Sequence, residues 1–149
     1  MNISPMEYLM KPLYTARATT TGGRNGHSRS EDGLLDLDLS VPESMGGPGK
    51  TGTSNPEQLF AAGYSACFGG AVEVAALQKR RRIEPVTITA DVTIGKEESG
   101  AFLLAVTLTG RIPGQSAEMV QELMVAAHDI CPYSRATRGN IKVKLVGAA

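Results

Sequence analysis

The sequence lacks an excess of charge of either sign and any long hydrophobic run free of polar residues. Its 15 Lys and Arg residues balance 15 Asp and Glu residues, so no global field favours nucleic acid or an acidic membrane. The longest apolar stretch, residues 60–77, consists largely of Ala and Gly and is interrupted by Ser65 and Glu73. We therefore expect neither a nucleic-acid partner nor a bilayer span.

A secretory signal is also missing. Residues 1–12 show neither a basic start followed by an apolar run nor a small-residue cleavage site, so we expect a cytoplasmic protein. Only two cysteines are present, Cys67 and Cys131. In a reducing compartment a permanent disulfide is disfavoured, so a bond between them is expected to be transient and catalytic. A free cysteine is also a common packing residue, so the pair alone leaves both interpretations open.

Hydrophobic periodicity predicts an α+β fold. At 149 residues the chain fits a single domain, residues 1–149. A glycine-rich turn is expected at 22–26 and a long loop at 42–54. The order of elements predicts an antiparallel sheet that packs on two main helices. Strands are expected at 13–21, 34–41, 85–96, 102–112 and 141–146, and helices at 56–81 and 116–130.

The first predicted helix has clear end signals. Ser54 or Asn55 can cap it, Pro56 stands in its first turn, and the cations of residues 79–82 suit the negative end of its dipole. The helix is apolar on most of its circumference, so it should be buried on nearly all sides. A domain of this size seldom wraps such a helix unaided, so a partner subunit is expected to cover the rest.

Cys67 lies in this helix, flanked by Phe60, Tyr64 and Phe68. An apolar surrounding raises the pKa of a thiol and leaves it inert, so a reactive Cys67 requires a nearby cation. An arginine is suited to this role because it stays charged when desolvated. Arg24, on its glycine-rich turn, is the best presented of several arginines, although spacing alone does not choose among them.

Long segments around both cysteines resemble the organic hydroperoxide resistance proteins of the OsmC-like superfamily. The resemblance covers nearly the whole chain, and the N-terminal extension, residues 1–10, is longer than the family leads us to expect. The matching segments are 55–68 (NPEQLFAAGYSACF), 131–134 (CPYS) and 136–140 (ATRGN), with shorter matches at 21–24 (TGGR), 39–42 (LSVP) and 46–49 (GGPG).

The resemblance implies roles for four residues. Cys67 matches the peroxidatic cysteine and Cys131 the resolving cysteine. Arg24 matches the arginine that activates the thiolate, and Glu57 matches the carboxylate that orients this arginine. The implied fold is OsmC-like, in an intertwined homodimer.

The resemblance also implies an activity. The expected enzyme is a thiol peroxidase that reduces organic hydroperoxides to alcohols through a sulfenic acid and an intramolecular disulfide. An external dithiol, of the lipoyl type by resemblance, would reduce that disulfide, and no metal, flavin or haem is expected. The apolar residues Phe60, Tyr64 and Phe68 are expected to line a pocket suited to hydrophobic hydroperoxides.

One geometric consequence concerns Glu57. It precedes Cys67 by ten residues on one predicted helix, which corresponds to about 15 Å along the axis at 1.5 Å per residue. The two side chains cannot share a site on one straight helix. Glu57 is therefore expected to serve a cysteine of the other subunit.

Three other interpretations concern a zinc site, a phosphate loop and a non-catalytic binding protein. A zinc site could use His128, Cys131, Cys67 and His27, but their spacing is not a paired-ligand pattern. A phosphate loop ending at residues 49–51 would need glycine at position 44, where serine stands. The remaining alternative is a non-catalytic protein of the same superfamily whose apolar cleft holds a small ligand.

Overall fold

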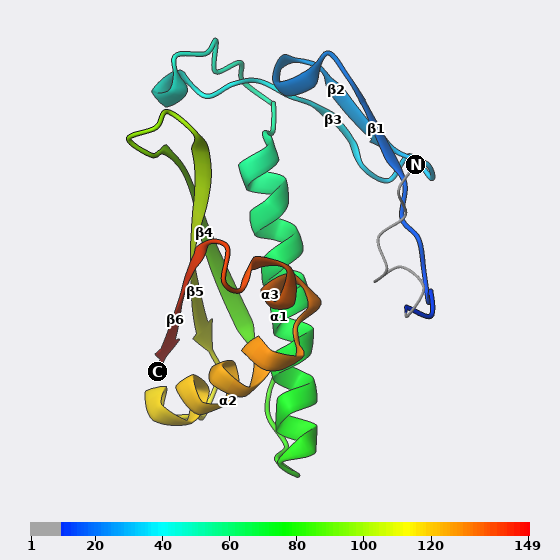
Figure 1. Ribbon diagram of the computed structural model, residues 1–149. Helices are drawn as coiled ribbons and strands as arrows, with labels where there is room; N and C mark the ends of the chain where they lie inside the picture. Colours follow the sequence, from blue (N-terminus) through cyan, green and yellow to red (C-terminus); the bar gives the residue numbers. More distant parts are fainter. Residues whose placement is uncertain (1–9) are drawn as a thin grey trace. The chain divides into compact units, whose positions relative to one another are not determined.

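The computed structural model describes residues 10–149, which fall into two compact units (Figure 1). The first unit ends at Asn55, and the second runs from Pro56 to Ala149. The expected N-terminal extension lies, except for Met10, outside the described residues.

The first unit contains a three-stranded antiparallel sheet in the order β1-β2-β3. The strands are β1 (Ala18–Thr21), β2 (His27–Ser30) and β3 (Asp36–Asp38). The sequence did not predict β2, because its four residues, HSRS, show no apolar alternation. β1 and β3 are shorter than predicted.

The predicted glycine-rich turn joins β1 to β2. It contains the short 3-10 helix η2 (Gly23–Asn25), which begins after Gly22 in the left-handed conformation at φ 83°. Within the predicted long loop, residues 42–54, a second 3-10 helix, η3 (Glu43–Met45), is the regular element.

The second unit holds a sheet in the order β4-β5-β6 together with three helices. The hairpin of β4 and β5 is antiparallel, as predicted. β6 instead runs parallel to β5, so this sheet is mixed. A parallel neighbour requires a long crossover, and the helices between β5 and β6 supply it. The elements are α1 (Pro56–Gln78), β4 (Thr87–Lys96), β5 (Phe102–Arg111), α2 (Ala117–Ile130), α3 (Pro132–Thr137) and β6 (Lys142–Ala148).

The core of the second unit lies between the sheet and the helices. α1 packs against β4 and α2, and α2 packs against β6. The buried residues of α1 are Tyr64, Phe68, Ala71, Val72, Ala75 and Ala76. They meet buried residues of β5 and α2, among them Val106, Leu108, Val120, Leu123, Met124 and Ala127.

The other face of α1 is exposed within this single chain, so its expected burial, which includes cover from a partner subunit, stays a prediction. Leu77 is 74% exposed and Val74 is 40% exposed. α1 is long and apolar enough to cross a membrane, whereas the sequence, with Ser65 and Glu73 in this stretch, predicts no span. Length and apolar composition are weak evidence for a span, because the core helix of a folded domain meets the same criteria. α1 is such a core helix.

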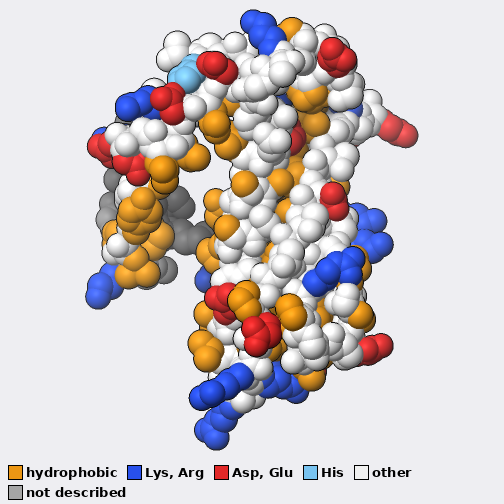
Figure 2. Space-filling model, turned by 180° about the vertical axis from the view of Figure 1, so that it is seen from behind, with side chains coloured by type: hydrophobic (Ala, Val, Ile, Leu, Met, Phe, Trp, Pro, Cys, Tyr) orange, Lys and Arg blue, Asp and Glu red, His pale blue; other side chains and the backbone are white. Residues whose placement is uncertain are grey.

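Charged side chains follow the end of α1. The helix ends at Gln78, short of the predicted end at residue 81, and Arg80 adopts the left-handed conformation at φ 55°. Lys79 and Arg81 both pair with Glu122 of α2, at N–O distances of 3.1 and 3.4 Å. Figure 2 shows basic side chains gathered at the bottom of the view, where α1 ends in Figure 1. Local pairing therefore accounts for much of this charge run.

Candidate active site

The two cysteines lie next to each other in the second unit. Their sulfurs are 3.4 Å apart, although 64 positions separate them in the sequence, and the Cys131 thiol donates to the Cys67 sulfur. Both thiols are free. Cys131 is completely buried, whereas Cys67 is partly exposed. A dissolved oxidant can therefore reach Cys67 more readily than Cys131.

Cys131 owes its position to the proline that follows it. A residue before proline is restricted to extended backbone, and Cys131 has φ −64° and ψ 123°. α2 ends at Ile130, as its predicted range has it, and Pro132 starts α3, which the sequence did not predict. Cys131 is thus the C-cap of α2 and the N-cap of α3. Proline suits the first helical position because its missing N–H has no partner there in any helix.

Four aromatic residues that are close in sequence to the two cysteines pack against one another. The ring centroid of Tyr64 lies 5.8 Å from that of Phe60, 6.3 Å from that of Phe68 and 5.7 Å from that of Tyr133. Tyr64 and Phe68 are completely buried core residues, while Phe60 is partly buried. The pocket role of Phe60, Tyr64 and Phe68 stays a prediction.

Sequence reasoning did not single out Tyr133. It directly follows the Cys-Pro pair, and this neighbourhood is the signal that could have found it. Tyr133 as a residue is 40% exposed, and its ring centroid lies 6.2 Å from that of Phe60. Tyr133 and Phe60 are therefore the aromatic residues near the thiols that remain open to solvent.

The immediate surroundings of Cys67 disfavour its thiolate. Burial raises the pKa of the Cys67 thiol above its ordinary value, because desolvation disfavours the charged thiolate. A hydrogen bond from the backbone N–H of Tyr133 acts in the opposite direction and lowers this pKa. A thiolate at neutral pH therefore requires positive charge in addition to these groups.

The other two predicted residues lie on separate units. Arg24 belongs to η2 in the first unit, and Glu57 stands in the first turn of α1 in the second. α1 is continuous from Pro56 to Gln78, so the separation of Glu57 and Cys67 along its axis is about 15 Å, as expected. The roles of Arg24 and Glu57 stay predictions.

Comparisons with known proteins agree with the sequence resemblance. A family model described as OsmC-like protein matches residues 47–146. Over 134 residues the chain is 51% identical to the organic hydroperoxide resistance protein OhrB of Bacillus subtilis, with 89% of this chain and 96% of the relative covered. It is 50% identical over 136 residues to the organic hydroperoxide resistance protein of Xanthomonas axonopodis pv. citri, with 91% and 94% covered.

A solved structure gives the same result. An organic hydroperoxide resistance protein from Legionella pneumophila superposes with a TM-score of 0.85 at 45% identity, over 93% of this chain and 100% of that chain. The chain belongs to the organic hydroperoxide resistance proteins of the OsmC-like family. The predicted family and the predicted α+β fold are thereby confirmed.

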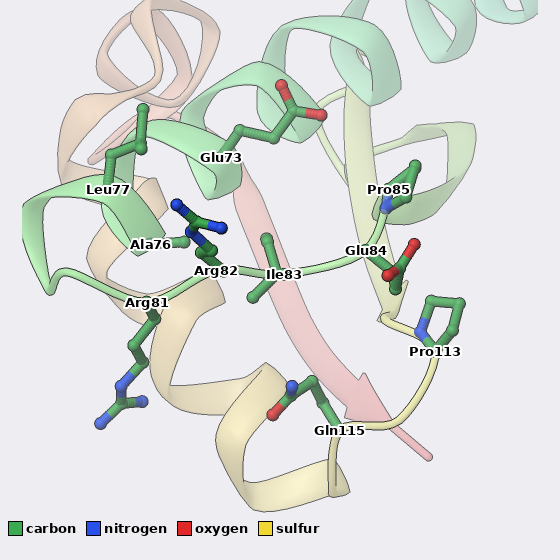
Figure 3. A pocket seen from close by; sticks show the side chains of 10 residues that line it. All are labelled: Glu73, Ala76, Leu77, Arg81, Arg82, Ile83, Glu84, Pro85, Pro113 and Gln115. Atoms are coloured by element: carbon green, nitrogen blue, oxygen red, sulfur yellow. The ribbon is translucent and has the colours of Figure 1, made fainter.

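A cavity elsewhere in this OsmC-like protein is distinct from the thiol pair. It has a volume of about 610 Å³ and lies at the C-terminal end of α1 (Figure 3). Two arginines and two glutamates give it no net charge, and neither cysteine lines it. Its lining residues are Glu73, Ala76, Leu77, Arg81, Arg82, Ile83, Glu84, Pro85, Pro113 and Gln115. Across residues 10–149, no group of three or more His, Cys, Asp or Glu side chains is arranged to hold a metal ion.

Proposed function

We propose that this member of the organic hydroperoxide resistance proteins is a cytoplasmic cysteine-based peroxidase that reduces organic hydroperoxides to alcohols. The observation that carries the proposal is the pair of free thiols whose sulfurs lie 3.4 Å apart, one partly exposed and one buried. The names of the relatives, which concern resistance to organic hydroperoxides, support the same substrate class.

In the first step the Cys67 thiolate attacks the outer oxygen of the hydroperoxide. The O–O bond breaks, the alkoxide leaves and takes up a proton to become the alcohol, and Cys67 becomes a sulfenic acid. Cys67 is assigned this role because it is the more accessible of the two thiols.

In the second step the Cys131 thiol condenses with the sulfenic acid. The S–O bond breaks, a disulfide forms and one water molecule is released. An external dithiol, of the lipoyl type by family resemblance, then reduces the disulfide and is itself oxidised. The cycle requires no metal, flavin or haem.

The activating charge is assigned to Arg24, oriented by Glu57. A guanidinium near the sulfur favours the thiolate and stabilises the negative charge that develops on the leaving oxygen. Because Glu57 and Cys67 stand about 15 Å apart along α1, we assign Glu57 to the cysteine of the other subunit in an intertwined homodimer. The exposed face of α1 supports this assignment, since a second subunit would cover it.

The substrate is assigned to the hydrophobic organic hydroperoxides. Phe60 is partly buried and packs against the buried core cluster that contains Cys131, Tyr64 and Phe68. An apolar wall of this kind gains more from burying an alkyl tail than from binding hydrogen peroxide.

Counting free thiols tests the proposal. One equivalent of an alkyl hydroperoxide should remove both free thiols of the reduced protein, with release of one alcohol per chain. Cys67→Ser should abolish alcohol release. Cys131→Ser should permit a single turnover, after which excess peroxide drives Cys67 to sulfinic acid, detectable by its mass.

The opposite result would favour a non-catalytic binding protein. In that case the reduced protein would keep both thiols, and Cys67→Ser would leave ligand binding intact.

A further inference from the structure

A cluster of buried hydroxyl groups joins the two helices that carry the cysteines. The Tyr64 hydroxyl lies 2.8 Å from Ser134 Oγ and 3.2 Å from Thr137 Oγ1. Tyr64 belongs to α1, and Ser134 and Thr137 belong to α3. These three residues are called the hydroxyl cluster below. Their side chains are buried, with exposed fractions of 0%, 0% and 7%.

The hydroxyl cluster lies one helical turn from each sulfur. Tyr64 precedes Cys67 by three residues on α1, and Ser134 follows Cys131 by three residues at the start of α3. Residues three apart on a helix share a face. The bond from Tyr64 to Ser134 therefore fixes the start of α3 against α1 close to both sulfurs.

Other contacts make α3 a rigid support for Cys131. Thr137 Oγ1 also donates to the backbone carbonyl of Ser134, at 3.2 Å. The backbone N–H of Arg135 donates to the carbonyl of Cys131, at 3.0 Å. Because Cys131 is the N-cap of α3, a displacement of α3 would displace the Cys131 sulfur with it.

The second chemical step, disulfide formation, requires that α3 hold Cys131 close to Cys67. A disulfide requires the two sulfurs about 2.05 Å apart, and in the reduced protein they are 3.4 Å apart. Only a small approach is then required, provided that α3 stays in place. If α3 moves away, condensation of the Cys67 sulfenic acid with the Cys131 thiol is delayed. A second peroxide molecule can then oxidise the sulfenic acid to sulfinic acid.

We infer that Tyr64 is a positioning residue for the resolving step, acting through its hydrogen bonds to Ser134 and Thr137. It holds the Cys131 thiol beside Cys67 and so sets the ratio of disulfide formation to overoxidation. The inference rests on the proposed peroxidase function. It concerns the second step alone, because the first step takes place at Cys67 on α1.

Tyr64→Phe tests this inference with little change in packing, since the ring and its contacts with Phe60, Phe68 and Tyr133 are kept. In stopped-flow experiments with an alkyl hydroperoxide, sulfenic acid formation should slow far less than disulfide formation, because the apolar ring of residue 64 is kept. Disulfide formation should be about tenfold slower or more, because the change removes the buried hydrogen bonds to Ser134 and Thr137. Excess peroxide should convert a correspondingly larger fraction of Cys67 to sulfinic acid, measured by mass spectrometry.

Two further variants complete the experiment. Ser134→Ala should also slow disulfide formation, and the double variant should add little to the effect of Tyr64→Phe, because Tyr64→Phe already removes the bond to Ser134. Ser65→Ala is the matched control, since its hydroxyl bonds only within α1, to the Ala62 carbonyl at 3.1 Å. It should behave as the wild type in both steps.

The outcomes separate this inference from the proposed function. If the wild type loses no thiols, the proposed function fails. If the wild type forms the disulfide and Tyr64→Phe forms it at the same rate, the inference alone is overturned. It is also overturned if Tyr64→Phe slows both steps equally, since the hydroxyl would then support the whole site rather than Cys131.

Discussion

The surroundings of Cys67 disfavour the thiolate that the proposed reaction requires. Burial raises the pKa of its thiol, and the hydrogen bond from the Tyr133 backbone N–H offsets this only in part. An apolar site has a compensating advantage, because a single added charge acts strongly where water is excluded. The proposed reactivity thus depends on one guanidinium rather than on the general polarity of the pocket.

Arg24→Met should therefore raise the pKa of Cys67 and slow its reaction with an alkyl hydroperoxide by about tenfold or more at neutral pH. The pH dependence of Cys67 alkylation by iodoacetamide, measured in the Cys131→Ser background, reports this pKa. Arg17→Met is a control of the same charge and type at an exposed ion pair with Glu31. Identical titration of Cys67 with and without Arg24 would refute the assignment.

His27 is a second residue whose charge depends on its setting. Its Nδ1 lies 2.7 Å from an Asp38 oxygen, and its Nε2 contacts Asp36, which also faces Arg29 at 3.9 Å. Only the imidazolium can donate from both nitrogens. The hydrogen bonds to Asp38 and Asp36 accordingly raise the pKa of His27 above its ordinary value.

The stability of the first unit should therefore depend on pH. A raised pKa in the folded state means that protonated His27 stabilises β2 against β3 below its unfolded pKa. This contribution is lost as the pH rises through the higher folded pKa. NMR titration of His27 should give a pKa above that of an unfolded peptide, and Asp38→Asn should lower it. Equal values in the two proteins would contradict the prediction.

At the scale of elements, close contact between α2 and β6 depends on a glycine. A Cβ at Gly147 would contact the backbone N of Gln121 and would come within 2.6 Å of the Ala117 carbonyl oxygen. Helix backbone cannot move aside as a flexible side chain can. The absence of a side chain at position 147 therefore sets how closely α2 packs on the sheet.

Gly147→Ala should lower the free energy of unfolding by about 1–3 kcal/mol, as expected for overpacking. Urea denaturation monitored by circular dichroism measures this change. Gly95→Ala is the matched control, because Gly95 also lies in a strand and a Cβ there would meet nothing within 4 Å. The control should be neutral or slightly stabilising. Equal stabilities of the two variants would contradict the argument.

At the scale of the whole molecule, the proposed dimer places two chains at each site. A chain with Glu57→Ala keeps its own Cys67, and a chain with Cys67→Ser keeps its own Glu57. In a mixed dimer with shared sites, one site would combine the intact Cys67 of the first chain with the intact Glu57 of the second. Sites built within one chain would remain defective in every dimer.

Mixing the two inactive variants after unfolding and refolding should therefore restore activity. About a quarter of the wild-type rate is expected, because about half of randomly formed dimers are mixed and each has one complete site. Peroxidase turnover measures this, and size-exclusion chromatography with light scattering gives the oligomeric state. A fully active monomer, or no recovery on mixing, would refute the shared site.

Local signals predicted α1, α2 and the hairpin, but not α3. Periodicity located α1, α2, β4 and β5, and Pro56 marked the start of α1, although α1 ends at Gln78 rather than at the predicted residue 81. β2 escaped prediction because its pairing relies on backbone hydrogen bonds rather than on an apolar pattern. The parallel direction of β6 escaped prediction as well, since it depends on the path of the intervening chain.

By itself the sequence determined the family and the α+β class, because long motifs and periodicity are local properties of the chain. It also placed Cys67 in a helix and Cys131 before a proline. Only the tertiary structure decided that their sulfurs lie 3.4 Å apart, that Cys131 is the buried one, and that Tyr64 joins their helices. These facts depend on how α3 packs against α1, and contact between segments so distant in the chain follows from the packing of the whole unit.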